Sequence, residues 1–193
     1  GRVLVEAAFD MAGGSGEFAI LSATSTATNQ NTWIANMEKL LKEDAKYKDL
    51  KLVKTAYGDD LRDKSVSETE ALLQTYPDLK VIVAPTTVGI AAASKAVQDA
   101  NLIGKVFVTG LGLPSEMAGH VKSGAVKSFA IWNPIDLGYS ITYAAHQFVT
   151  GKAGKTVSLG RVGTATPDAD GSAPMAEPFT YDASNVEKFA KFF

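Results

Sequence analysis

The stretch LKVIVAPTTVGIAAASKAVQDA, residues 79–100, decides the fold class. It begins with a short β-branched apolar run, Leu79–Ala84, which is typical of a strand buried on both faces of a sheet. The polar turn Pro85–Thr87 ends the run, and the Ala-rich stretch Val88–Ala100 then has the composition of a helix. A strand, a short turn and a helix in this order are part of a βαβ unit.

The same alternation recurs along the rest of the chain. Short apolar runs predict four more strands, at Glu17–Ala23, Leu50–Tyr57, Lys105–Gly110 and Val126–Trp132. Amphipathic stretches predict further helices, at Asn29–Tyr47, Ser65–Tyr76, Pro114–Ser123 and Ile135–Val149. Ser65 and Glu68 form a capping-box pattern, which predicts Ser65 as the N-cap. The sequence therefore predicts an α/β fold with a parallel, doubly wound, Rossmann-like sheet.

Both ends of the chain differ from this regular pattern. The first residues have a helical pattern from the outset, so we expect a processed or truncated chain. The region Lys152–Pro178 is rich in Gly, Ala, Thr, Asp and Pro, which predicts a long irregular connection with Ser158–Val162 as its one strand candidate. A short amphipathic helix is expected within Ala183–Phe193.

Composition excludes several classes of function. The chain has 193 residues and a net charge of −2, which argues against a nucleic-acid partner and against a polybasic membrane-surface protein. No apolar run approaches the roughly 20 residues that span a bilayer. With no cysteine, the chain has neither a disulfide scaffold, nor a Cys-containing zinc site, nor thiol catalysis.

Polar segments follow the predicted strands, at the edge of a parallel sheet where ligands bind. They offer hydroxyls, amides, two carboxylates and one large aromatic ring, a mixture that suits a neutral, polyhydroxylated molecule. The predicted ligand-binding residues are Asn29, Gln30, Asp59, Asp60, Pro85, Thr87, Trp132 and Asn133. Simpler interpretations stay open: Asn29 as a helix cap, Gln30 as solvated surface, Trp132 as core and Asp59-Asp60 as an exposed turn.

Motifs for catalysis or cofactor binding do not fit their contexts. Gly14–Ala19 matches G-x-G-x-x-A but precedes a strand, and Gly110–Ser115 ends in Ser and follows the fourth strand. The sequence contains no P-loop and no Gly-x-Ser-x-Gly elbow. His120 and His146 fall in predicted helices without metal-ligand spacing. We therefore expect no cofactor, no metal and no enzymatic activity.

Four segments resemble the second lobe of type I periplasmic sugar-binding proteins of ABC importers, in the rhamnose-binding and autoinducer-2-binding branch. They are residues 22–33, 73–86, 108–117 and 123–134. The resemblance places Asn29-Gln30 where the autoinducer-2 branch has an Asp-Gln ligand pair, which favours a deoxysugar such as rhamnose. In the same branch the third strand ends in a Pro-x-Ala motif around the ligand, and this chain has the proline as Pro85 and a threonine, Thr87, at the third position. Asn133-Pro134 matches the polar residue and proline that end the family's fifth strand. An acidic sugar ligand expected near Leu111-Gly112 is absent.

The resemblance also implies a division of the chain. Residues 1–134 would form the second, ligand-binding lobe, residues 135–151 a helix of the first lobe, and residues 152–193 the crossover or hinge segment with the closing helix. The opening strands of the first lobe are then expected to be missing. The helix at 135–149 would expose an apolar face, so we predict that the fragment self-associates.

The function implied by the resemblance is a receptor that captures a sugar between two lobes and delivers it to an ABC importer permease. Its location would be periplasmic, or extracellular and lipid-anchored in a Gram-positive source. An alternative is the effector domain of a sugar-responsive transcription regulator, which shares the fold. A nucleotide-using transferase is a third hypothesis, although Thr24–Thr28 supplies no glycine for a phosphate loop.

Overall fold

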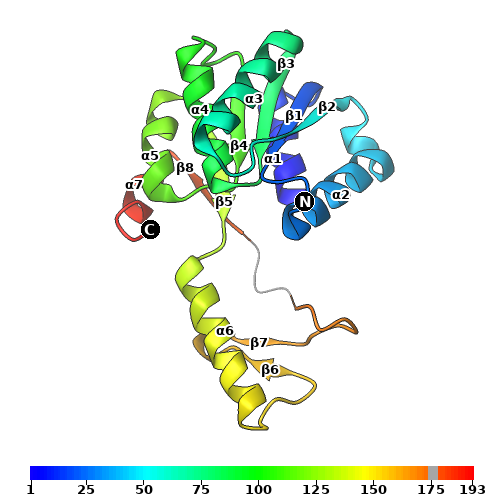
Figure 1. The fold of residues 1–193 in the computed structure, drawn as a ribbon, viewed down its shortest axis with the longest axis vertical. Helices are drawn as coiled ribbons and strands as arrows, with labels where there is room; N and C mark the ends of the chain where they lie inside the picture. The colour runs from blue at the N-terminus through cyan, green and yellow to red at the C-terminus, as the bar shows by residue number, and fades with distance from the viewer. Residues whose placement is uncertain (174–177) are drawn as a thin grey trace. The chain divides into compact units, whose positions relative to one another are not determined.

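The computed structural model describes residues 1–173 and 178–193. It divides into two compact units, which are considered separately (Figure 1). The sheet unit consists of Gly1–Ala130 and Thr180–Phe193, and the α6 unit consists of Ile131–Phe179. This division differs from the predicted boundaries at 134 and 151, because the last fourteen residues group with the sheet unit.

The sheet unit is built on four parallel strands in the order β2-β1-β3-β4. The strands are β1 (Gly16–Ser22), β2 (Leu50–Tyr57), β3 (Leu79–Ala84) and β4 (Phe107–Gly110). Beyond β4, β5 (Ser128–Ile131) is joined by isolated parallel bridges and pairs in turn with β8 (Phe179–Asp182). The predicted α/β fold with a parallel sheet is confirmed.

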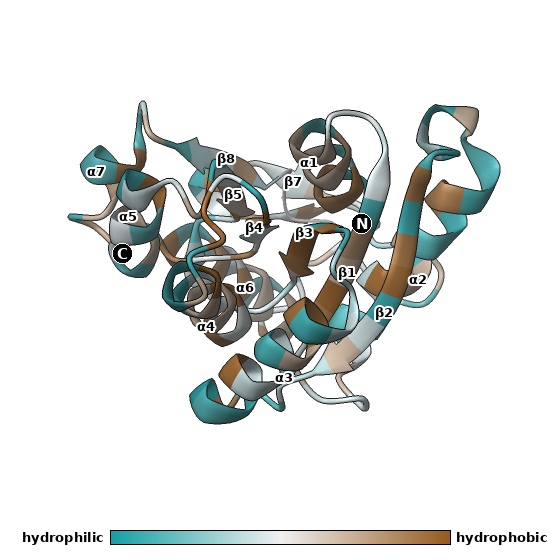
Figure 2. Cartoon of the chain, turned by 90° about the horizontal axis from the view of Figure 1, so that it is seen from above, coloured by the Kyte–Doolittle hydropathy of each residue, from teal (hydrophilic) through white to brown (hydrophobic). Residues whose placement is uncertain are grey.

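Helices cover both faces of this sheet (Figure 2). Phe18, Ile20, Val81 and Val83 alternate along β1 and β3 and share one core with α1 and α2. The opposite face packs against α3 and α4. The helices of the unit are α1 (Arg2–Ala12), α2 (Thr28–Glu43), α3 (Arg62–Thr75), α4 (Thr87–Asp99), α5 (Pro114–Ser123) and α7 (Val186–Phe189), with a 3-10 turn at Ala45–Tyr47.

The predicted start of α3 is wrong. The helix begins at Arg62, and the backbone N–H of Ser65 already donates to the carbonyl of Leu61 at 2.8 Å. Ser65 is buried rather than capping, and it packs so closely on Gly58 that a Cβ there would lie 2.1 Å from its hydroxyl oxygen. The capping-box pattern therefore falls inside the helix.

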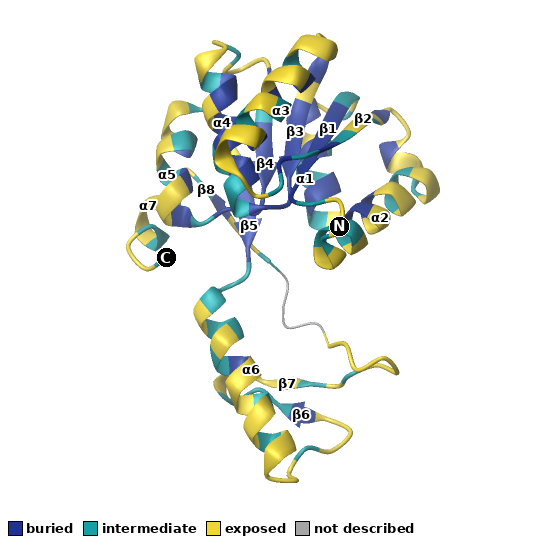
Figure 3. Ribbon diagram, viewed as in Figure 1, coloured by how far each residue is buried: buried dark blue, intermediate teal, exposed yellow. Residues whose placement is uncertain are grey.

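The α6 unit contains α6 (Pro134–Val149) and a small antiparallel pair, β6 (Val157–Ser158) and β7 (Thr164–Ala165). The strand candidate Ser158–Val162 is wrong for most of its length, because Gly160–Val162 forms a 3-10 turn between the two strands. Within the described part of this unit, the buried residues are Ile131, Ser140 and Val157 (Figure 3). Across the described residues of the whole chain, no helix has both the length and the apolarity to cross a membrane.

Candidate functional site

The strand order creates a topological switch point at the carboxyl ends of β1 and β3, and we call the loops around it the switch-point crevice. From β1 the chain passes to β2 on one side and then returns to β3 on the other side. The loops that follow β1 and β3 therefore diverge, and in open α/β sheets ligands bind at such a switch point. Here those loops are residues 23–27 and 85–86. The strand order thus places a candidate binding site between them.

Hydrogen bonds connect the loops around this crevice. Gln30, in the first turn of α2, donates from Nε2 to the carbonyl of Pro85 at 3.3 Å. Asp60, in the loop after β2, accepts a hydrogen bond from the hydroxyl of Thr86. The loops after β2 and β1 are joined by the N–H of Asp59, which donates to the carbonyl of Ala23 at 3.0 Å. Segments from three strand ends therefore form one connected structure.

Two helices begin at this crevice without side-chain caps. The N-cap of α2 is Ala27, and Thr86, the N-cap of α4, makes no side-chain bond to its own helix. The first N–H groups of a helix have no partner within the helix. These N–H groups, with their partial positive charge, are suitable donors for ligand oxygens.

The loop after β2 has an unusual backbone. Asp59 and Asp60 both have a φ of 53°, in the left-handed region that few residues other than glycine adopt. The Asp59 carboxylate pairs with Lys64 at 2.5 Å, and this hydrogen bond raises the pKa of Lys64. Asp59 is half-buried and Asp60 is exposed.

Six predicted site residues lie at this end of the sheet unit: Asn29, Gln30, Asp59, Asp60, Pro85 and Thr87. Asn29 is exposed in the first turn of α2, so it is not the cap of that helix. Thr87 is half-buried and is the first residue of α4. Contact of these residues with a ligand stays a prediction.

The other two predicted residues, Trp132 and Asn133, belong to the α6 unit. Asn133 caps α6, because its Oδ1 accepts from the N–H of Ile135 at 2.9 Å and of Asp136 at 3.3 Å. Its Nδ2 donates to the Asp136 carboxylate at 3.0 Å, and Asp136 also pairs with Arg161 at 2.8 Å. The Asn133 amide therefore stabilises the start of a helix, and Trp132 beside it is half-buried.

Sequence reasoning did not select two residues at the crevice. Thr86 joins the loops after β2 and β3, and its place in a polar turn was a signal that could have been used. Ser22, at the end of β1, is 1% exposed, and its hydroxyl has no hydrogen-bond partner in the described structure. Buried hydroxyls usually have a partner, so Ser22 is unusual, but nothing in its sequence context predicts this.

His120 makes a structural contact between two helices of the sheet unit. His120 pairs through Nδ1 with Gln98 at 3.1 Å, which joins α5 to α4, and burial lowers its pKa. Among the described residues, no group of three or more His, Cys, Asp or Glu side chains could hold a metal ion.

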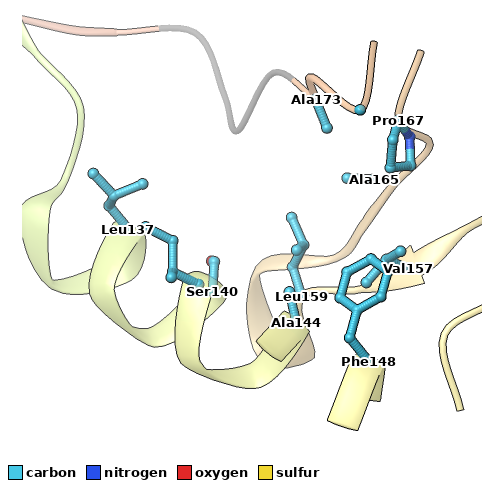
Figure 4. Close-up of a pocket in the computed structure, with 11 residues that line it drawn as sticks. Leu137, Ser140, Ala144, Phe148, Val157, Leu159, Ala165, Pro167 and Ala173 are labelled. Carbon is cyan, nitrogen blue, oxygen red and sulfur yellow. The ribbon is translucent and has the colours of Figure 1, made fainter. Parts of the chain in front are cut away.

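A cavity of about 260 Å³ lies in the α6 unit (Figure 4). Its walls come from α6, from the β6–β7 segment and from residues 167–173 after it, and the labelled side chains Leu137, Phe148 and Leu159 are apolar. Ser140 supplies one hydroxyl. This lining does not offer the several polar groups that a polyhydroxylated ligand requires.

Comparison with known families decides what kind of protein this is. Residues 1–153 match the model of the periplasmic binding protein domain family. The chain belongs to this family. The type I periplasmic-binding-protein fold predicted from the sequence is thereby confirmed.

Solved structures of ABC transporter proteins agree with this assignment. An ABC transporter solute-binding protein from Clostridium phytofermentas with bound L-rhamnose is 42% identical, with a TM-score of 0.91 over 100% of this chain and 64% of that one. A sugar ABC transporter from Actinomyces odontolyticus is also 42% identical, with a TM-score of 0.85 over 97% of this chain and 62% of that one. LsrB from Clostridium saccharobutylicum in complex with AI-2 has the same fold, with a TM-score of 0.84 at 20% identity over 97% of this chain and 66% of that one. The chain thus spans less than two thirds of the length of the first two proteins.

Proposed function

We propose that this chain is the larger part of a sugar receptor of an ABC importer, and that its ligand is a rhamnose-like deoxysugar. The observation that carries the proposal is the switch-point crevice, where six predicted polar or turn residues gather beside two uncapped helix N-termini. The 42% identity to a protein with bound L-rhamnose supports the choice of sugar.

The chemistry of the crevice suits a neutral sugar. Asn29 and Gln30 each carry an amide that can donate to one hydroxyl and accept from another. The hydroxyl of Thr87 and the free N–H groups at the start of α4 add further hydrogen-bonding groups. A neutral set of this kind binds hydroxyls without the desolvation cost of an unpaired charge.

In this proposal residues 1–134 form most of one lobe, and the sugar is held between it and a first lobe that includes residues 135–151. Binding of the sugar shifts the population toward a closed form, which then docks on the permease. The receptor acts in the periplasm, or outside the cell on a lipid anchor, and it performs no chemical reaction on the sugar. The transport proteins among its relatives favour this function over the transcription-regulator alternative.

Calorimetry with the receptor expressed from its complete gene tests the proposal. L-rhamnose and L-mannose form a matched pair, because they differ by one hydroxyl. We expect L-rhamnose to bind and L-mannose to bind at least about tenfold more weakly, since a buried extra hydroxyl without a partner costs about 1–3 kcal/mol. If no sugar tested gave a heat of binding, the proposal would be contradicted.

Two variants of the same helix locate the site. Asn29→Ala removes an amide at the crevice, whereas Asn36→Ala removes an equally exposed amide further along α2. We expect Asn29→Ala to weaken L-rhamnose binding about tenfold, the effect of losing one hydrogen bond to the ligand, and Asn36→Ala to leave it unchanged. Equal effects of the two substitutions would remove Asn29 from the site.

A further inference from the structure

We propose that Asp60 is a positioning residue, which fixes Thr86 and through it the start of α4, and that it does not itself contact the ligand. This inference rests on the proposed function, because it assigns a role within the same crevice. It replaces the prediction from sequence that Asp60 binds the sugar directly.

The backbone of the loop after β2 carries the first part of the argument. Only four residues, 58–61, separate β2 from α3, and two consecutive ones, Asp59 and Asp60, adopt left-handed conformations. Such conformations are unfavourable for a non-glycine residue and persist where surrounding contacts impose them. The contacts of Asp59 are its pair with Lys64 and its N–H bond to Ala23. The side-chain contact of Asp60 is the hydroxyl of Thr86.

Thr86 supplies the second part of the argument. It is 6% exposed and occupies the N-cap position of α4 with an extended backbone, φ −151° and ψ 139°. A threonine in this position ordinarily accepts a hydrogen bond from the first turn of its helix. Here the hydroxyl donates to Asp60 instead, and no side-chain cap forms. The Thr86 hydroxyl is thus held at Asp60, and the first turn of α4 has no side-chain cap from its N-cap residue.

The turn after β3 is held from two sides as a result. Gln30 of α2 binds the carbonyl of Pro85, and Asp60 binds the hydroxyl of Thr86. Gly89 allows α4 to approach β1 closely, because a Cβ there would lie 2.7 Å from the Thr86 methyl and 3.4 Å from the carbonyl oxygen of Leu21. With its turn fixed and its helix seated on β1, Thr87 can be presented to the crevice in one orientation.

A double-mutant cycle on the complete receptor separates positioning from direct contact. Asp60→Gly removes the carboxylate and keeps a residue that tolerates positive φ, while Thr86→Val removes the hydroxyl. We expect each single variant, and also the double variant, to bind L-rhamnose about tenfold more weakly than the unaltered receptor. A direct contact would instead make the double variant markedly weaker than Thr86→Val alone, and that result would overturn the proposal.

Further variants distinguish positioning from general damage. Thr86→Ser keeps the hydroxyl and should bind L-rhamnose within about twofold of the unaltered receptor. Asn101→Gly makes the same backbone change at another left-handed residue, φ 56°, and should have no effect on binding. If Thr86→Ser weakens binding as much as Thr86→Val, the hydroxyl has no role and the proposal is wrong.

Amide hydrogen exchange of the ligand-free receptor gives a readout that does not depend on the sugar. We expect Asp60→Gly and Thr86→Val each to change exchange in the first turn of α4, and Asn101→Gly not to change it. Unchanged exchange in the first two variants would overturn the positioning role even where L-rhamnose binds. Conversely, the receptor could show the expected exchange pattern and yet fail to bind L-rhamnose. That result would contradict the proposed function and leave the positioning role of Asp60 standing.

Discussion

Helices α2 and α6 have the same length, sixteen residues, but they are buried to very different extents. The sheet unit buries Ile34 and Met37 of α2 in a core with α1 and the strands. In α6 the buried residue is Ser140, whereas Phe148 is 62% exposed and Val149 is 87% exposed. The more apolar helix is therefore the less buried one. An apolar pattern predicts that a helix forms, but it does not predict whether the same chain covers that helix.

The largest expected difference between the units comes from one substitution made in each. Phe18→Ala removes a fully buried ring from β1, and we expect it to lower the free energy of unfolding by about 3–5 kcal/mol. Phe148→Ala removes an exposed ring from α6, and we expect a change within about 0.5 kcal/mol. Urea unfolding of the 193-residue chain measures both effects. If both substitutions lowered the free energy of unfolding by similar amounts, the contrast between the buried β1 and the exposed α6 would be contradicted.

A smaller loss is expected from a glycine within the sheet. Gly110 ends β4 at φ 151°, and a Cβ there would lie 1.8 Å from the carbonyl oxygen of Ala84. Gly110→Ala should therefore lower the free energy of unfolding by about 1–3 kcal/mol, as is typical of overpacking. Gly119→Ala in α5 is the matched control, because a Cβ there meets no atom within 4 Å and alanine favours a helix. Thermal unfolding should show a lower Tm for the first variant and an equal or higher Tm for the second.

The exposed face of α6 should make the 193-residue chain associate. Ile141, Phe148 and Val149 are exposed together on this helix, and apolar surface of this kind favours contact with a second copy. Sedimentation velocity should show association that increases with concentration. Phe148→Lys should weaken it, whereas Leu61→Lys, at an exposed leucine of the sheet unit, should not. A strictly monomeric profile at all concentrations would show that the exposed face of α6 does not cause self-association.

The smallest expected effect is a pH dependence from His120 in the sheet unit. Burial, followed by the charges of Arg62 and Lys95, lowers its pKa below the ordinary 6.5. The unfolded chain therefore takes up a proton at higher pH than the folded chain does. The contribution to stability is present above pH 6.5 and is lost as the pH falls through the folded pKa.

Urea unfolding at pH values from 7 to 5 measures this effect. His120→Gln should make the free energy of unfolding less dependent on pH over this range. A pH profile unchanged by His120→Gln would assign the dependence to other groups.

Sequence reasoning found the sheet because strands buried on both faces are continuous apolar runs, as in Leu79–Ala84. It also predicted which polar segments gather at one edge of the sheet, since the end of each strand fixes where the next polar segment lies. It did not find β8, because these four residues form a strand by pairing with β5, a partner distant in sequence. It also missed the role of Thr86, because no pattern in the sequence shows that Asp60 adopts a left-handed conformation and reaches that hydroxyl.

A crystal structure of the complete receptor with L-rhamnose tests the central claim most directly. The account predicts sugar oxygens within hydrogen-bond distance of Asn29, Thr87 or the first N–H groups of α4, with the carboxylate of Asp60 still bound to Thr86. L-rhamnose bound away from the ends of β1 and β3, for example in the apolar cavity of the α6 unit, would contradict it.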